Sequence, residues 1–244
     1  QRIARWSGDE ALPDAHAARA DTRVALGRWT LLRDAASGAY TATLPAPEAG
    51  IMLDLQLVPS QPLLLQGDAG FSRKGPQPQQ ASHYYTQPQL AVRGRLRPGG
   101  PVLAGRGWLD HEWSDELLAP GAVGWDWIGI NLADGGALTA FQLRRADGSV
   151  VWAGGSHRPA GGTVRSFAPD EVAFTTQRRW ASPATGASYP VEWAIATPAG
   201  RFTLRALLDA QELDSRTSVG TVYWEGLAEL LAPGGARAGL GYLE

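Results

Sequence analysis

The fold is decided by residues 124–152, which read GWDWIGINLADGGALTAFQLRRADGSVVW. Three apolar runs are separated here by Asp134-Gly135-Gly136 and by Asp147-Gly148. An Asp-Gly pair between apolar runs is a strong hairpin signal, because the central residues of such turns need positive φ. The segment therefore predicts a meander of three strands, at 125–132, 137–144 and 149–153.

The rest of the chain repeats this pattern of short runs and frequent turns, which favours an all-β barrel or sandwich. The alanine-rich segment 9–21 is the exception and predicts a short helix, interrupted by Pro13. Further strands are expected at 28–34, 39–44, 51–58, 82–86, 89–97, 102–109, 171–179, 190–197, 201–208 and 220–231. The strands become longer after residues 98–104, where we place a domain boundary.

Composition excludes several classes of function. The chain has 244 residues, of which 44% are hydrophobic, so it can bury a substantial core. Its net charge of −2 does not favour a nucleic acid or an anionic membrane as partner. The absence of cysteine excludes disulfides, thiolate metal sites and cysteine nucleophiles. No apolar run approaches the roughly 20 residues of a membrane-spanning helix.

The stretch from residue 107 to residue 127 carries most of the candidate chemistry. It contains four of the ten tryptophans, interleaved with Asp110, His111, Glu112 and Asp126. Carboxyl groups wedged between large rings are desolvated, which raises their pKa and lets them hold a proton near neutral pH. The alternative is structural: the tryptophans form core, and the acids are paired or lie on the surface.

Strand alternation separates the two candidate acids. Trp108 and Asp110 share one face of their strand, while His111 points the other way. In the next strand, Asp126 shares a face with aliphatic residues and needs either a partner or a proton. An ion pair with an arginine is the favoured reading for Asp126, and a neutral acid in a pocket is the alternative.

An ordered set of short motifs resembles the AttH/carotenoid 1,2-hydratase family of lipocalin-like proteins. The central motif is Gly107-x-x-Asp110-His111-x-Trp113, followed by Gly124-Trp125-Asp126-Trp127. The motifs cover roughly residues 60–244, and the AttH-like branch resembles this chain more than the hydratases do. The other pieces are Leu65-Gln66-Gly67, Lys74-Gly75-Pro76, Ser82-His83-Tyr84-Tyr85, Leu143-Arg144, Asp147-Gly148, Tyr189-Pro190-x-x-Trp193, Gln211-Glu212, Tyr223-Trp224-Glu225-Gly226 and Gly241-Tyr242-Leu243-Glu244.

The resemblance implies two calycin-type antiparallel β-barrel domains. The first would span residues 1–104 and be incomplete in this chain, because the family's upstream strands are not matched. The second would span residues 105–244.

The resemblance also implies that Asp110 is the proton donor to an alkene carbon. Trp108 stands where the hydratases have tyrosine, and Glu112 stands where they have asparagine. Trp108 offers a π face to a carbocation, which makes it the second candidate catalytic residue. Glu112 is a like-charge neighbour of Asp110, which would raise the pKa of Asp110 or, alternatively, compete with it for the proton.

The remaining candidates are ligand-binding residues, and we expect no cofactor and no metal. Asp110, His111 and Glu112 are consecutive, so in a strand they cannot all converge on one ion. The alternative is a site in which Asp110 and Glu112, on one face, are joined by His83 across strands. Lys74 lies in a segment expected to form a mobile rim over a pocket mouth or a plain surface loop. The expected ligand-binding side chains are His111, Trp113, Trp125, Asp126, Trp127, Tyr85 and Trp224.

Two functions follow from these expectations. In the first, the protein is a hydro-lyase that hydrates an alkene of a lipid or isoprenoid ligand by acid catalysis. In the second, it is a non-catalytic carrier of such a ligand, located in the bacterial periplasm or cell envelope, with an ABC-type export permease as partner.

Overall fold

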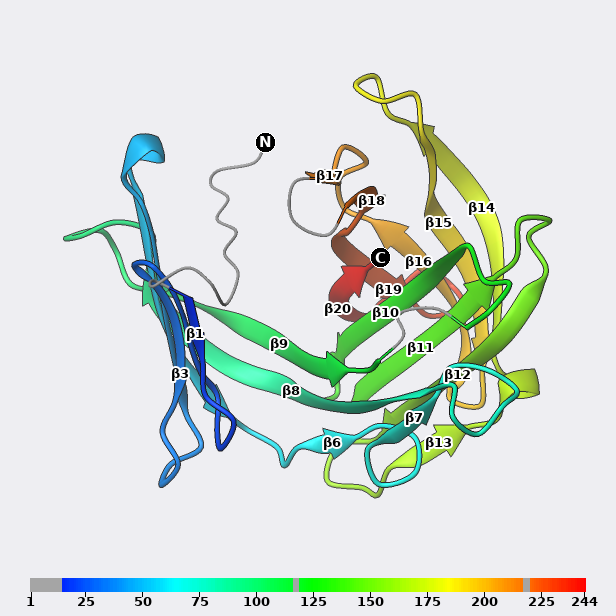
Figure 1. The fold of residues 1–244 in the computed structure, drawn as a ribbon, viewed down its shortest axis with the longest axis horizontal. Helices are drawn as coiled ribbons and strands as arrows, with labels where there is room; N and C mark the ends of the chain where they lie inside the picture. Colours follow the sequence, from blue (N-terminus) through cyan, green and yellow to red (C-terminus); the bar gives the residue numbers. More distant parts are fainter. Residues whose placement is uncertain (1–14, 116–118, 217–219) are drawn as a thin grey trace. The chain divides into compact units, whose positions relative to one another are not determined.

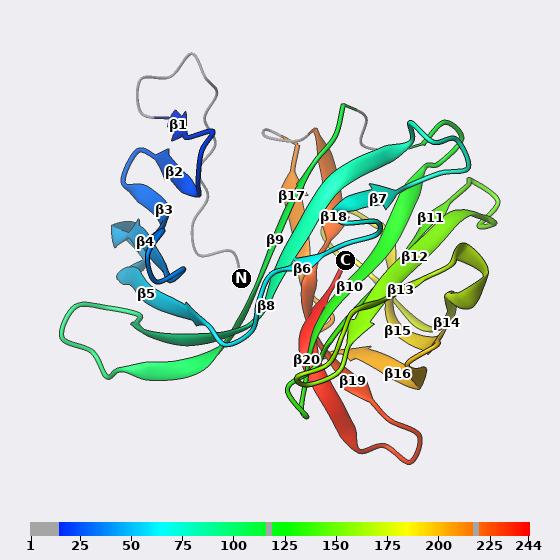
Figure 2. The same ribbon diagram turned by 90° about the horizontal axis from the view of Figure 1, so that it is seen from below.

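The computed structural model describes residues 15–115, 119–216 and 220–244. Within these ranges the chain is nearly all-β, and its only helical elements are two short 3₁₀ turns, η1 (Pro47–Ala49) and η2 (Pro169–Glu171). The prediction of an all-β, lipocalin-like fold built from curled antiparallel sheets is confirmed (Figures 1 and 2). None of the described helices is long and apolar enough to cross a membrane.

The chain divides into two compact units. Of the described residues, the first contains 15–62, 89–107, 215–216 and 220–221, and the second contains 63–88, 108–115, 119–214 and 222–244. Residues 63–88 thus pack with the C-terminal part of the chain. The expected boundary at residues 104/105 stays a prediction, since domains and packing units need not coincide.

The first unit is an antiparallel meander that ends on the second half of a long strand, β8 (Ala81–Arg95). Gln89, in the middle of β8, has a φ of +53°. The sequence predicted two strands there, at 82–86 and 89–97, where the structure has one. The other strands are β1 (Ala15–Ala17), β2 (Arg23–Leu26), β3 (Trp29–Arg33), β4 (Tyr40–Ala46) and β5 (Ile51–Pro59).

The prediction of a helix at residues 9–21 is wrong for the part that the structure describes, which begins at residue 15. Residues 15–17 form β1, which pairs with β2 through Ala15↔Leu26. Residues 9–14 lie outside the described residues.

The second unit is dominated by a nine-stranded antiparallel sheet in the order β13-β12-β11-β10-β20-β19-β16-β15-β14. This sheet curls around an apolar core, as Figure 1 shows. Its strands are β10 (Gly124–Leu132), β11 (Ala137–Arg144), β12 (Val150–Arg158), β13 (Arg165–Phe167), β14 (Ala173–Ala181), β15 (Ser188–Thr197), β16 (Gly200–Ala206), β19 (Gly226–Leu231) and β20 (Arg237–Leu243). A separate pair is formed by β17 (Glu212–Ser215) and β18 (Thr221–Trp224).

The predicted meander forms as expected. β10 pairs with β11, and β11 pairs with β12, both antiparallel. Gly135 and Gly148 adopt φ values of +93° and +82° in the two turns, the conformation for which glycine is suited. The local sequence therefore fixes this part of the sheet.

A second, smaller sheet of this unit lies against the outer face of β10 and β11. It consists of β6 (Leu64–Leu65), β7 (Phe71–Arg73), the first half of β8, and the second half of β9 (Leu103–Trp113). Alternation along β8 buries Ser82, Tyr84 and Thr86 and leaves His83 exposed. The buried face of this small sheet carries the candidate site.

Candidate active site

Two faces of β10 have different surroundings. Ile128 and Ile130 point into the main apolar core, together with residues such as Leu138 and Trp193. Trp127 points to the opposite face and packs with Tyr84 and Phe141 in a second cluster, with Trp125 at its edge. The candidate site lies on this second face, between β10 and the small sheet.

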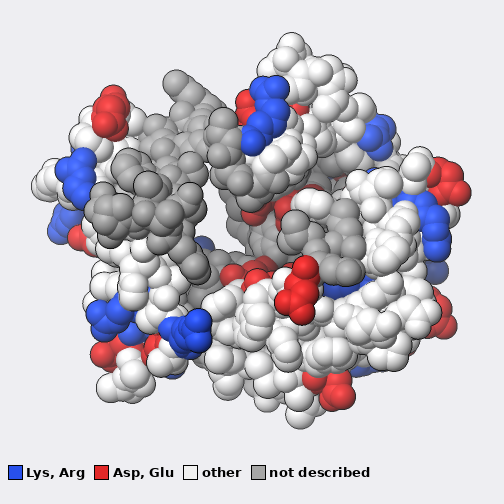
Figure 3. Space-filling model, in the orientation of Figure 1, with Lys and Arg blue, Asp and Glu red and all other residues white. Residues whose placement is uncertain are grey.

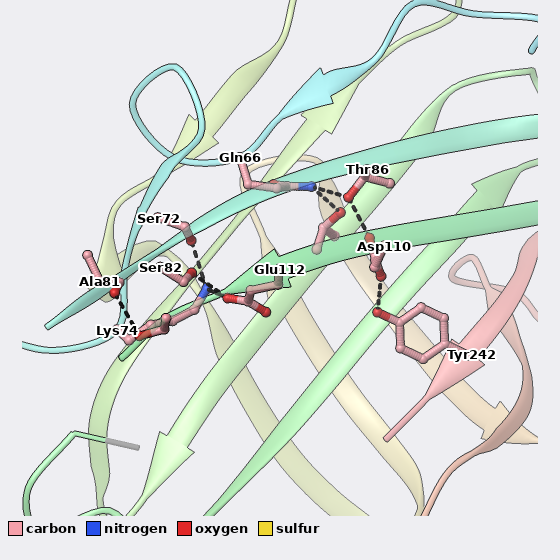
Figure 4. A network of polar contacts seen from close by, with 11 residues as sticks. Gln66, Ser72, Lys74, Ala81, Ser82, Thr86, Asp110, Glu112 and Tyr242 are labelled. Carbon is pink, nitrogen blue, oxygen red and sulfur yellow. Dashed lines mark hydrogen bonds and ion pairs between the residues drawn. The ribbon is translucent and has the colours of Figure 1, made fainter. Parts of the chain in front are cut away.

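The carboxyl of Asp110 is held by three neutral donors, two of which appear in Figure 4. Thr86 Oγ1 donates to Oδ1 at 2.6 Å. Trp108 Nε1 and Tyr242 Oη donate to Oδ2 at 2.9 Å and 2.5 Å. The donors come from β8, β9 and β20, so strands far apart in sequence position this one group.

Burial raises the pKa of Asp110, although hydrogen bonds from Thr86, Tyr242 and Trp108 act in the opposite direction. Among the described residues, no arginine or lysine forms an ion pair with this carboxyl. The buried hydroxyl of Tyr84 lies beside it, and burial raises the pKa of that tyrosine. Asp110 is therefore a half-buried acid with polar but uncharged bonding partners.

Gly129 lets the donors of Asp110 approach β10 closely. A Cβ at this position would lie 2.5 Å from Tyr242 Cε1 and 2.7 Å from the Trp108 ring. Real Cβ atoms do not come so close to other heavy atoms, so any side chain here would displace both rings. The glycine is part of the site geometry.

Lys74 forms a second polar centre on the same face. Its Nζ lies 4.4 Å from the ring centroids of both Trp127 and Phe141, and 5.1 Å from that of Tyr84. The ammonium pairs with Glu112 at 2.9 Å and bonds to Ser72 Oγ at 2.8 Å. Burial lowers the pKa of Lys74, and Glu112 opposes that effect.

The loop expected here is present and its residues 76–79 are exposed, but the Lys74 side chain does not lie on its surface, because only 9% of the residue is exposed. Glu112 is bound to Lys74 and to Ser82. It is neutralised in this arrangement and does not compete with Asp110 as a free carboxylate.

Two further carboxyls surround the centre. Burial raises the pKa of Glu225, and it raises the pKa of Glu244 to about 7, with the charges of Glu225 and Asp110 adding to the effect. Among the described residues, no group of three or more His, Asp or Glu side chains is arranged to hold a metal ion.

Asp126 has the environment that the sequence favoured for it. It is 3% exposed and pairs with Arg144 Nε at 2.6 Å, while Gln142 Nε2 donates to the same carboxyl oxygen at 2.7 Å. Burial raises its pKa, and the guanidinium counteracts that effect. This carboxylate is committed to an ion pair on the core side of β10.

The structure brings only some of the expected residues to Asp110. Trp108 contacts it directly, and Trp125 and Trp127 lie on the same side of β10. Trp224 belongs to the main core, where its Nε1 donates to the Asp209 carbonyl at 2.7 Å.

His111, Trp113 and Tyr85 lie on the opposite face of the small sheet. Trp113 stacks on His83, with ring centroids 5.3 Å apart, and Tyr85 Oη bonds to His111 Nδ1 at 2.8 Å. Trp113 is 51% exposed, so it belongs neither to the core nor to the layer around Asp110. Alternation explains this, because Trp113 and His111 share a face that Asp110 does not.

Sequence reasoning missed several residues that make the site: Tyr242, Thr86, Gln66 and Lys74. Tyr242, Gln66 and Lys74 lie within the motifs that carry the family resemblance, but the motifs predict no contact of these three residues with the candidate acid. Lys74 also carried a signal of its own, since it is the only lysine of the chain.

A cavity of about 370 Å³ adjoins the site layer at β7, β12 and β13. It shares Gln66, Ser72 and Phe141 with that layer, and the guanidinium of Arg73 lies 5.0 Å from the ring centroid of Trp152 at its wall. Small residues create this space; the strand wall here includes Ala153, Gly154 and Gly155.

The fold and the site define a lipocalin-like protein with a partly buried, neutrally bonded acid between two sheets. The model of the AttH-like family matches residues 1–244, and the chain belongs to that family. No curated protein sequence matches it.

Two solved structures are similar. An AttH-type protein from Nitrosomonas europaea is 45% identical, with a TM-score of 0.85 over 93% of this chain and 70% of that one. Kievitone hydratase from Nectria haematococca is 17% identical, with a TM-score of 0.69 over 90% of this chain and 68% of that one. The second likeness concerns the fold alone.

Proposed function

We propose that the protein binds a hydrophobic ligand of the lipid or isoprenoid class and hydrates one of its alkenes, with Asp110 as the proton donor. The observation that carries this is the bonding of Asp110: a desolvated carboxyl with three neutral donors and, within the part of the chain that the structure describes, no ion pair with a lysine or arginine. Such an acid can keep a proton and release it, whereas an acid paired with arginine cannot.

The proposed reaction balances as an acid-catalysed addition of water. The Asp110 proton is transferred to one alkene carbon, and the π electrons form the new C–H bond. The other carbon becomes a cation, which the π face of Trp108 stabilises. Water adds to that carbon and loses a proton, which restores Asp110.

The name of the structural relative kievitone hydratase supports the reaction class, although the likeness to it is one of fold. The hydrophobic nature of the ligand is supported by the rings of Trp108, Trp125 and Trp127 on the Asp110 side of β10.

A second candidate is a non-catalytic ligand carrier in the cell envelope that serves an ABC-type permease. It is favoured by the higher identity to an AttH-type protein, 45% against 17% for the hydratase. The two candidates share the ligand site and differ in whether Asp110 transfers a proton.

The experiment is to assay Asp110→Asn for binding and turnover of an acyclic carotenoid, with Asp126→Asn as the matched control. We expect Asp110→Asn to bind the polyene but to lose about 10²–10⁴-fold in turnover, the usual contribution of a general acid. Asp126→Asn should retain turnover. Binding without turnover in the parent protein would exclude hydration of this substrate and leave the carrier.

A further inference from the structure

A buried amide lies one hydrogen bond away from the partner of Asp110. Gln66, which follows β6, is 2% exposed. Its Nε2 donates to Thr86 Oγ1 at 3.0 Å and to Thr139 Oγ1 at 3.1 Å, and its Oε1 accepts from Ser156 Oγ at 2.7 Å. The amide is thus anchored to β11 and β12 and reaches Asp110 only through Thr86 (Figure 4).

The contacts of Thr86 fix the direction of its hydroxyl. A threonine hydroxyl has one hydrogen to donate. Gln66 Nε2 can only donate, so of these two partners of Thr86 Oγ1 only Asp110 Oδ1, 2.6 Å away, can accept its hydrogen. Oδ1 is therefore held as an acceptor.

The other carboxyl oxygen is different. The Trp108 indole can only donate, but the Tyr242 hydroxyl can donate or accept. The hydrogen in the 2.5 Å contact between Tyr242 Oη and Oδ2 can therefore reverse direction, unlike that of the Trp108 indole.

We propose that Gln66 is a positioning residue for Asp110: through Thr86 it keeps Oδ1 an acceptor and so directs the acid proton to Oδ2, beside Tyr242 and Trp108. The catalytic role of the Asp110 proton rests on the proposed function. The positioning itself concerns the free protein and is measured without substrate.

Other titratable groups face Asp110 from the surrounding elements, and the test must hold them constant. They are Tyr84 on β8, Tyr242 and Glu244 at β20, Glu225 between β18 and β19, and Lys74 with its partner Glu112. The variants below change only uncharged side chains, so the charges around Asp110 stay the same.

The experiment is a ¹³C NMR titration of Asp110 in a double-mutant cycle of Gln66→Leu and Thr86→Val. Removing the Thr86 donor should raise the Asp110 midpoint by about one pH unit, since a charge-assisted hydrogen bond is lost. Gln66→Leu removes the amide donor that polarises the Thr86 hydroxyl. Its hydrogen bond to ionised Asp110 should therefore weaken, which should raise the midpoint by about half a pH unit. The double variant should match Thr86→Val alone.

Thr86→Ser keeps the hydroxyl and should titrate as the parent does. Thr139→Val removes a Gln66 contact that does not lead to Asp110 and controls for general loosening. If Gln66→Leu does not fold, Ser156→Ala releases Gln66 Oε1 and should give a smaller rise of the same sign.

An unchanged midpoint in Gln66→Leu, or a Gln66 effect that persists in full on the Thr86→Val background, would overturn the proposal. If Gln66→Leu is unfolded, an unchanged Asp110 midpoint in Ser156→Ala would overturn the proposal instead. A protein that turns over no polyene but shows the predicted cycle would refute the hydratase function and leave the positioning intact.

Discussion

Two acids on opposite sides of β10 differ in chemistry: Asp126, which is buried and belongs to β10, and Asp110, which is half-buried and belongs to β9. On one face, Asp126 pairs with Arg144 beside a closed apolar core. On the other, the carboxyl of Asp110 meets rings and neutral donors. The comparison shows that burial raises the pKa of both carboxyls, while the charge of the bonding partner separates a structural acid from a candidate proton donor.

The largest expected effect concerns the rings that fill the Asp110 face. Trp127 is 8% exposed and stacks on Phe141 with centroids 4.4 Å apart. We expect Trp127→Ala to cost about 3–5 kcal/mol of unfolding free energy, because it removes a large buried side chain. Trp113→Ala, at a 51% exposed position, should cost less than about 1 kcal/mol. Urea denaturation measures both, and equal losses would show that this face is not a packed layer.

Gly129→Ala tests how closely the rings must approach β10. The added methyl would lie within 2.7 Å of both Trp108 and Tyr242, so one or both must shift away from Asp110. Overpacking of this kind should cost about 1–3 kcal/mol. Displacement of the donors should lower polyene turnover by about tenfold or more. Gly105→Ala, where a Cβ meets nothing within 4 Å, is the control; identical behaviour of the two variants would contradict the close-approach account.

Asp126→Asn tests the core side of β10. It leaves the Arg144 guanidinium without its carboxylate, which is destabilising when the pair is buried. Because the Arg144 side chain is 31% exposed, we expect a loss of about 1–2 kcal/mol. On the Arg144→Met background, Asp126→Asn should cost less than it does in the parent protein. Thermal denaturation of Asp126→Asn, Arg144→Met and the double variant measures this difference. Additive losses would mean that the pair contributes nothing beyond its separate residues.

The smallest effect is a pH dependence carried by Glu244. Its folded-state pKa of about 7 exceeds the ordinary 4.5, so the folded protein keeps a proton that the unfolded chain has released. The free energy of unfolding should therefore fall as pH rises from about 4.5 to about 7. Above about pH 7, Glu244 should cause no further loss. Glu244→Gln should flatten the Tm profile in this window, while the exposed Glu48→Gln should not. A parent profile that rises through the window would contradict the sign.

The sequence predicted the fold well wherever a local signal acts. The Asp-Gly turns and alternating runs defined β10, β11 and β12, and the isolation of Asp126 on an aliphatic face predicted its arginine partner. In contrast, the alanine-rich N-terminal segment predicted a helix, but its residues 15–17 form a strand that depends on pairing with β2.

The site was predicted only in part, because its contacts join distant strands. Asp110 and Trp108 were identified from one motif, two residues apart on one face. Tyr242 lies 132 residues from Asp110 in sequence, and no local pattern predicts that its hydroxyl meets that carboxyl. The burial of Lys74 likewise depends on rings contributed by β8, β10 and β11.

The most direct test of the proposed proton transfer is the incorporation of solvent deuterium into an acyclic carotenoid in D₂O, followed by mass spectrometry. The parent protein and Asp126→Asn should each add one carbon-bound deuterium per hydrated alkene, and Asp110→Asn should add none above the uncatalysed background. Equal incorporation by the parent and Asp110→Asn would show that the proton comes from elsewhere and would contradict the assignment of Asp110 as the acid.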